Sequence, residues 1–75
     1  MYSRESVIAE KKSFVENELS TCLKASGVGV EYLIYQCLGY RELVTIHFVG
    51  GGQRIVNVEG DSKAAIIEDV MKHVY

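Results

Sequence analysis

The stretch from Leu43 to Val74 constrains the fold of this chain most, because two alternating apolar segments, a glycine turn and an amphipathic segment follow one another within it. In its first part the apolar side chains of Val44, Ile46 and Phe48 alternate with polar ones. Alternation with a period of two is typical of a strand with one buried face. We therefore predict a strand over 43–49 with these three side chains in the core.

A hairpin and a second strand are predicted next. Gly50, Gly51 and Gly52 lie between two alternating segments, and glycine accepts a positive φ angle without a steric clash, as tight hairpin turns require. The alternation resumes in a strand predicted over 53–58. The two faces of that strand carry Val56 with Val58 on one side and Ile55 with Asn57 on the other.

A C-terminal helix is predicted over 62–74. Asp61 or Ser62 supplies its N-cap, since either side chain can accept a hydrogen bond from a free backbone N–H. Lys72 and His73 lie in the last turn, where positive charge suits the helix dipole. Helical spacing gives one apolar stripe, formed by Ala64, Ile67, Val70, Met71 and Val74.

The N-terminal third predicts a helix over 3–25. Ser3 or Ser6 is the expected N-cap, and Gly27 is the expected left-handed residue after the helix. The charged residues, Glu16 among them, are expected on a solvated face. The apolar side of this helix is formed by Ile8, Val15, Leu19, Cys22 and Leu23.

A further strand is predicted over 30–38, which is rich in aromatic and β-branched residues and is apolar on both faces. Short connections favour pairing between neighbouring strands, and both helices must bury their apolar sides. The whole chain, 1–75, is therefore predicted to be one α+β domain of order α-β-β-β-α. Its three strands form an antiparallel meander with both helices on one face.

The opposite face of this sheet is the candidate interaction surface, because an apolar patch on a small domain is often an interface. We expect a homodimer or a complex with another protein, formed through this face or through an exposed strand edge. A shift by one residue in the first strand would exchange its two faces. The predicted interface residues are Leu33, Tyr35, Thr45, His47, Ile55 and Asn57.

Composition limits the class of protein further. The chain has 75 residues, 48% of them hydrophobic, and a net charge of −2, which is not the basic balance of most nucleic-acid-binding domains. No apolar segment approaches the roughly 18 residues that span a bilayer, and the first residues lack the apolar core of a signal peptide. We expect a cytoplasmic protein without membrane contact. Cys22 and Cys37 are expected to be buried, reduced thiols.

No catalytic, metal or cofactor site is predicted. His47 and His73 have no carboxylates or thiols at a spacing that would complete a metal site, which needs three or four ligands. The three glycines lie between strands, whereas phosphate-binding loops precede a helix. We therefore expect no enzymatic activity, no cofactor and no small-molecule substrate, and we interpret the chain as a protein-interaction domain.

The α-β-β-β-α order and the segment G-D-S-K-A-A at 60–65 resemble a double-stranded-RNA-binding domain, in which a G-x-S-K motif opens the last helix. The resemblance implies a phosphate contact by Lys63. Independently of it, Tyr32 and Tyr35 on the sheet, with Arg41 and Arg54 near its edges, could stack on nucleic-acid bases. The lysine cluster of that family is replaced here by apolar residues, which reduces attraction to phosphates. Nucleic-acid binding is therefore the alternative to protein binding.

The ending V-N-V-E-G-D-S-K-A-A-I-I-E-D-V at 56–70 is similar to that of small proteins of unknown function encoded by phages and mobile elements of Gram-positive bacteria. Those proteins share a V-N-V, D-S and A-x-I-x-D-V pattern. The resemblance implies a cytoplasmic setting and an accessory role for such an element. It implies no particular activity.

Overall fold

The computed structural model describes residues 4–74 and has the predicted α+β architecture, α-β-β-β-α, with a three-stranded antiparallel meander. The N-terminal helix is continuous but contains a π-helical segment, η1, between two α-helical ones. The elements are α1 (Arg4–Ser13), η1 (Phe14–Leu19), α2 (Ser20–Ala25), β1 (Val30–Leu38), β2 (Arg41–Phe48), β3 (Gln53–Asn57) and α3 (Lys63–Val74).

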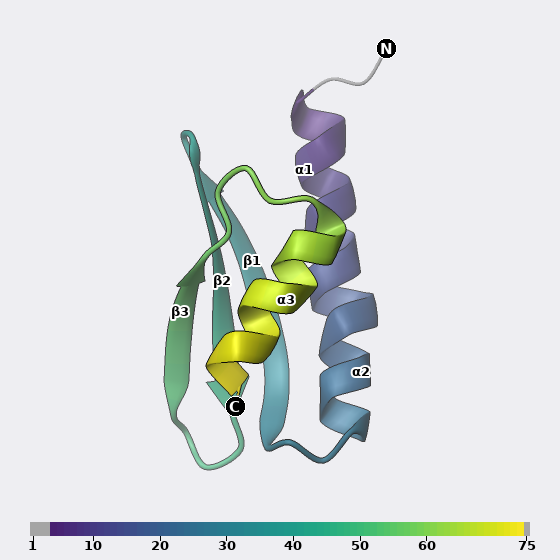
Figure 1. The fold of residues 1–75 in the computed structure, drawn as a ribbon, viewed down its shortest axis with the longest axis vertical. Coiled ribbons are helices and arrows are strands. Elements are labelled where there is room, and N and C mark those ends of the chain that lie inside the picture. The colour runs from purple at the N-terminus through teal and green to yellow at the C-terminus, as the bar shows by residue number, and fades with distance from the viewer. Residues whose placement is uncertain (1–3, 75) are drawn as a thin grey trace.

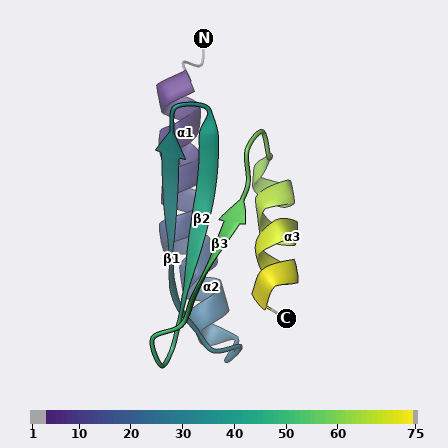
Figure 2. The ribbon, with the colours of Figure 1, turned by 90° about the vertical axis from the view of Figure 1, so that its left-hand side faces the viewer.

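The sheet has the order β1-β2-β3, so that β1 and β3 form its two edges. Figure 1 shows α3 in front of the sheet, the N-terminal helix running alongside β1, and β3 at the opposite edge. In Figure 2 no helix lies between the viewer and the strands. One side of the sheet therefore packs against the helices, and the other side is uncovered within residues 4–74.

The core lies between the helices and the covered side of the sheet. Val44 and Ile46 are buried and Phe48 packs against the core, as the alternation of that strand predicts. The buried apolar set is Val15, Leu19, Leu23, Val30, Leu33, Tyr35, Val44, Ile46, Val56, Val58, Ile66 and Val70.

The π-helical segment follows from the spacing of the apolar anchors in the N-terminal helix. Val15, Leu19 and Leu23 are four residues apart and are 0%, 7% and 4% exposed. An α-helix has 3.6 residues per turn, so side chains spaced by four drift around its axis. A π-helical turn is wider and offsets this drift. The three anchors therefore stay aligned over β1.

The predictions about the two cysteines and about one N-cap candidate are wrong. Cys22 is exposed, because the four-residue spacing aligns its neighbours Leu19 and Leu23 with the sheet and turns Cys22 outward. Cys37 is half-buried rather than buried, and both thiols are free. Ser6 is not the N-cap, since α1 already includes it. Ser3, the alternative N-cap, lies outside the described residues.

The turns form where the glycines predict them. Gly27 follows α2 with φ 72°, in the left-handed region. Gly50 and Gly51 have φ angles of 99° and 100°, and the N–H of Phe48 donates to the carbonyl of Gly52 at 2.8 Å. The glycine segment is thus the predicted hairpin between β2 and β3.

The last helix is capped by Ser62, one of the two predicted candidates. Its Oγ accepts a hydrogen bond from the N–H of Ala65 at 3.3 Å. The apolar stripe differs from the prediction by one position: Ile66 is fully buried, whereas Ile67 is 38% exposed. Adjacent isoleucines point about 100° apart on a helix, so periodicity alone leaves the choice to the angle at which α3 crosses the sheet.

Candidate interaction surface

The uncovered side of the sheet, called the open face below, is defined by the strand register. In the pairing of β2 with its neighbours, Thr45 lies opposite Ile34 of β1 and Ile55 of β3. Residues two positions along each strand share this face. The open face consists of Tyr32, Ile34, Gln36, Leu38, Arg41, Leu43, Thr45, His47, Gln53, Ile55 and Asn57.

Apolar and polar side chains alternate across the open face as well as along it. Thr45 lies between two isoleucines, whereas in the next row Leu43 lies between Gln36 and Asn57. The most exposed apolar side chains on this face are Leu38, Ile55 and Tyr32, at 60%, 61% and 42%. The open face is therefore a mixed surface with separate apolar side chains and not one continuous apolar patch.

One aromatic pair lies on the open face. Tyr32 and His47 are cross-strand neighbours with stacked rings, 4.3 Å between centroids and 15° between planes. Offset stacking of aromatic rings stabilises such cross-strand pairs. The pair fixes two of the largest side chains of this face at the end of the sheet near the β2–β3 hairpin.

The predicted interface residues divide into two groups. Thr45, His47, Ile55 and Asn57 do lie on the open face. Leu33 and Tyr35 do not: both are 2% exposed and belong to the core, so this part of the prediction is wrong.

An irregularity between Val30 and Tyr32 explains the error in the first strand. Val30 is buried, and the extra residue of a β-bulge reverses the alternation that follows it. Leu33 therefore faces the helices, and Tyr32 and Ile34 face outward. The one-residue shift considered above is the correct register, and a strand that is apolar on both faces does not reveal it from its sequence.

The β1 edge of the sheet is closed by side chains of the N-terminal helix. The N–H groups of Leu33 and Tyr35 point away from β2. The first donates to Ser20 Oγ at 2.6 Å and the second to Glu16 Oε2 at 2.9 Å. Lys12 holds Glu16 in place through an ion pair of 2.9 Å. Glu16 was expected on a solvated face, and its contact with β1 could not be inferred from its charge.

The β3 edge is open. The N–H of Phe48 donates to Gly52 and that of Val58 to the carbonyl of Glu42, so the even-numbered residues of this segment bond to β2. In an antiparallel pair the intervening residues direct both N–H and C=O to the other side. Within residues 4–74, these groups of Gln53, Ile55 and Asn57 meet no other strand or helix.

A polar cluster connects α1 to the central strand of the sheet near the β1–β2 turn. Glu42 accepts hydrogen bonds from Lys11 Nζ at 2.9 Å, from the N–H of Gly60 at 3.0 Å and from the hydroxyl of Tyr35. Although burial by itself raises the pKa of Glu42, the hydrogen bonds from Tyr35, Lys11 and Gly60 hold it below its ordinary value. Burial raises the pKa of Tyr35, and the bond to Glu42 raises it further. Glu42 thus links α1, β1 and the loop before α3 by hydrogen bonds.

Asp61 is the contrasting carboxylate. A hydrogen bond with Asp69, burial and the charge of Asp69 raise the pKa of Asp61 to about 6, against the opposing charge of Lys11. Its Oδ2 is buried and has no hydrogen-bond partner within residues 4–74. The loop between β3 and α3 thus contains a carboxylate that is poorly satisfied when ionised.

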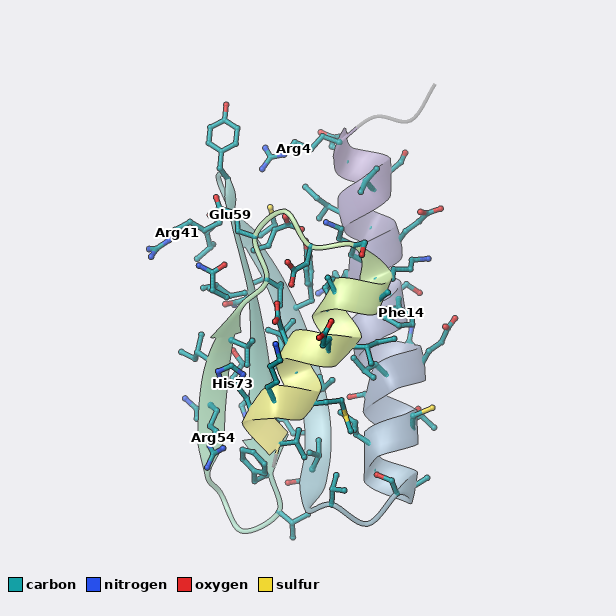
Figure 3. All side chains as sticks on the ribbon, viewed as in Figure 1. Arg4, Phe14, Arg41, Arg54, Glu59 and His73 are labelled. Carbon is teal, nitrogen blue, oxygen red and sulfur yellow. The ribbon has the colours of Figure 1, made fainter. Side chains whose placement is uncertain are left out.

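The basic residues named for nucleic-acid contact do not converge. Arg41 and Arg54 lie at different ends of the sheet in Figure 3. Arg54 Nη1 donates to the carbonyl of His73 at 2.6 Å, which ties it to the end of α3. The ammonium of Lys63 lies 5.7 Å from the ring centre of Phe14. Each of these last two cations is thus in contact with a neighbouring structural element.

Several kinds of site have no counterpart in the described part of the chain. Residues 4–74 enclose no pocket. Among them, no three His, Cys, Asp or Glu side chains gather as a metal site requires. None of the helices between Arg4 and Val74 combines the length and apolar character needed to cross a membrane.

Comparison with known proteins assigns this chain to no family. A scan against protein-family models found no match, and neither a curated protein nor a solved structure shows significant similarity to the chain.

Proposed function

We propose that this chain is a small, non-enzymatic interaction domain that associates with a second copy of itself. The observation that supports the proposal is the exposure of large apolar side chains on the side of the sheet that no described helix covers. Leu38 and Ile55 are each about three-fifths exposed there, at 60% and 61%. Burial of such side chains against protein stabilises a complex by the hydrophobic effect.

The mixed character of the open face suits an interface that forms and separates. Interfaces of this kind are about as apolar as the rest of a protein surface and keep a polar rim. The face carries one basic residue, Arg41, and no acidic one. Association through it should therefore depend little on salt. The two free thiols, Cys22 and Cys37, fit a reducing, cytoplasmic setting.

Light scattering of the full chain over a range of concentrations tests this proposal. We expect a mass above the 8.4 kDa of one chain, unchanged between low and high salt and unchanged by added duplex RNA. Ile55→Glu should restore the monomer, because two carboxylates would meet at the contact. Ile67→Glu is the matched control, since Ile67 is an exposed isoleucine of α3.

Two results would contradict the proposal. One is a monomeric mass under every condition. The other is a mass that rises only with duplex RNA at low salt, which would favour the nucleic-acid alternative. In that case neutralising Lys63 or Arg41 should weaken binding, and Ile55→Glu should not.

A further inference from the structure

The two edges of the sheet are unequal, and this inequality indicates how two copies meet. The outward N–H groups of β1 at Leu33 and Tyr35 already donate to Ser20 and Glu16. The outward groups of β3 at Gln53, Ile55 and Asn57 meet no strand or helix of the described chain. An unpaired edge is a ready template for another strand.

We propose that two copies associate by antiparallel pairing of β3 with β3, about a two-fold axis at Ile55, to form one continuous sheet. This inference rests on the self-association proposed above and specifies its geometry. In this register Ile55 lies opposite Ile55 of the second copy, and Gln53 lies opposite Asn57. All of these residues direct N–H and C=O outward, so each facing pair exchanges two hydrogen bonds.

The side chains of β3 are compatible with self-pairing. Gln53 and Asn57 are neutral amides, so no like charges meet in the facing pairs. Arg54, the single charged residue of the strand, is directed to the helix side by its bond to His73 and would lie opposite Val56. Ile55 is 61% exposed, and its pairing with itself would bury part of this apolar surface.

The alternative geometry, face against face, is less favourable. Thr45 lies at the centre of the open face, with Gln36, His47 and Asn57 around it. Stacking of two such faces would remove these polar side chains from water without providing regular partners, which costs free energy. Edge pairing instead provides a partner for every outward backbone group at 53, 55 and 57, and it leaves the polar side chains in water.

The closed β1 edge limits the assembly to two copies. Pairing of β3 with β3 uses the same surface of both chains and is therefore closed. The outer edges of the resulting sheet are then both β1, where Ser20 and Glu16 accept from the outward N–H groups of Leu33 and Tyr35 and the N-terminal helix runs alongside the strand (Figure 1). The two open faces become one continuous surface, with the pair of Ile55 side chains at its centre.

Sedimentation equilibrium of the wild-type chain and of two variants at the same position tests this geometry. Ile55→Pro removes the outward N–H of Ile55 and leaves the ladder with β2 intact, because proline is tolerated where the N–H faces away from the sheet. Ile55→Thr keeps the N–H and changes only the side chain. We expect a wild-type dimer, a Kd raised about 100-fold by proline through the loss of two symmetric hydrogen bonds, and a change of only several-fold by threonine.

Hydrogen exchange of the wild-type chain provides a second test that does not depend on the folding of any variant. The amides of Gln53, Ile55 and Asn57 should exchange more slowly as protein concentration rises, whereas that of Leu33, already bonded to Ser20, should not change. A dimer without this concentration dependence overturns edge pairing and leaves self-association through the open face. A chain that is monomeric at every concentration overturns both proposals.

Discussion

The two edges of the sheet differ in whether their outward backbone N–H groups have hydrogen-bond acceptors. Along β1 the N-terminal helix lies close enough for Ser20 and Glu16 to accept hydrogen bonds from Leu33 and Tyr35. Along β3 no described element does so, and α3 covers the face of the sheet rather than this edge (Figures 1 and 2). An edge strand is a liability unless it is covered, charged or very short. Within residues 4–74 one edge is thus covered and the other is unpaired.

A similar asymmetry holds for two half-buried carboxylates, Glu42 and Asp61. Glu42 has three hydrogen-bond donors around it and a lowered pKa. Asp61, which follows β3, has a raised pKa and a buried Oδ2 that has no hydrogen-bond partner among the described residues. The carboxylate near the N-terminal helix thus has more hydrogen-bond partners than the carboxylate in the loop between β3 and α3.

The largest effect is expected from loosening the helix that closes the β1 edge. Leu19 is 7% exposed within η1 and anchors this helix in the core. Leu19→Ala should lower the free energy of unfolding by about 3 kcal/mol, through lost burial and the cavity left behind. Urea denaturation measures this change, and Ile67→Ala, at an exposed position of α3, is the control that should change it by less than about 1 kcal/mol. Equal losses in the two variants would contradict the assignment of Leu19 as an anchor.

A smaller effect is expected from opening the β1 edge itself. Ser20→Ala leaves the buried N–H of Leu33 without an acceptor, which should cost about 2 kcal/mol. Ser13→Ala is the control, because the hydrogen bond that Ser13 accepts from Asn17 is exposed, and this substitution should cost less than about 0.5 kcal/mol.

The double variant Glu16→Ala, Ser20→Ala sharpens the contrast between the edges. With both acceptors removed, the N–H groups of Leu33 and Tyr35 lose the partners that they have in the wild type, and the helix beside β1 loses two of its bonds to the strand. We expect species larger than a dimer in sedimentation velocity, because a helix held less firmly can move aside and let β1 pair with another strand. A double variant that stops at the mass of the wild-type assembly would show that these two side chains do not limit its growth.

The sequence allowed the layers of this fold to be predicted but not its edges. The alternation of Val44, Ile46 and Phe48 and the three glycines were enough for the hairpin, since each signal is local. The register of β1 could not be predicted, because a bulge after Val30 shifts a strand that is apolar on both faces. The contact of Glu16 with β1 depends on a π-helical turn and on a partner 19 residues away, and neither is apparent from a single charged residue.

Asp61 provides a test of how stability depends on pH. Most carboxylates stabilise a fold more as pH rises, whereas Asp61 should stabilise this one less. Its folded-state pKa of about 6 lies above the ordinary value of 3.8, so the folded chain binds this proton more tightly than the unfolded chain does. The contribution of Asp61 to stability therefore falls as pH rises from about 4 to 6. Asp69, Glu42 and Lys11 are the charged groups around it.

The variant Asp61→Asn removes the free-energy cost of ionising Asp61 in the folded chain. We expect it to raise the free energy of unfolding by about 1 kcal/mol at pH 7, a value reduced by solvent screening. The gain should disappear near pH 4, where Asp61 of the wild type is largely protonated in the folded state. Urea denaturation at the two pH values measures the difference. A gain of the same size at both would show that the repulsion from Asp69 is not its cause.

The smallest effect is expected at Arg54, the charged residue of β3. Its guanidinium donates to the carbonyl of His73 and lies 5.6 Å from the ring centre of Phe48, on the helix side. Arg54→Ala should cost about 0.5 kcal/mol, because it removes a cation from the C-terminal end of α3. Arg41→Ala, on the open face, is the control and should change stability less. If the charge of Arg54 does not guard the edge, its removal should leave the dimer unchanged in sedimentation equilibrium. A stronger dimer in Arg54→Ala would mean instead that this charge opposes the approach of a second strand, and the edge would then be a protected one.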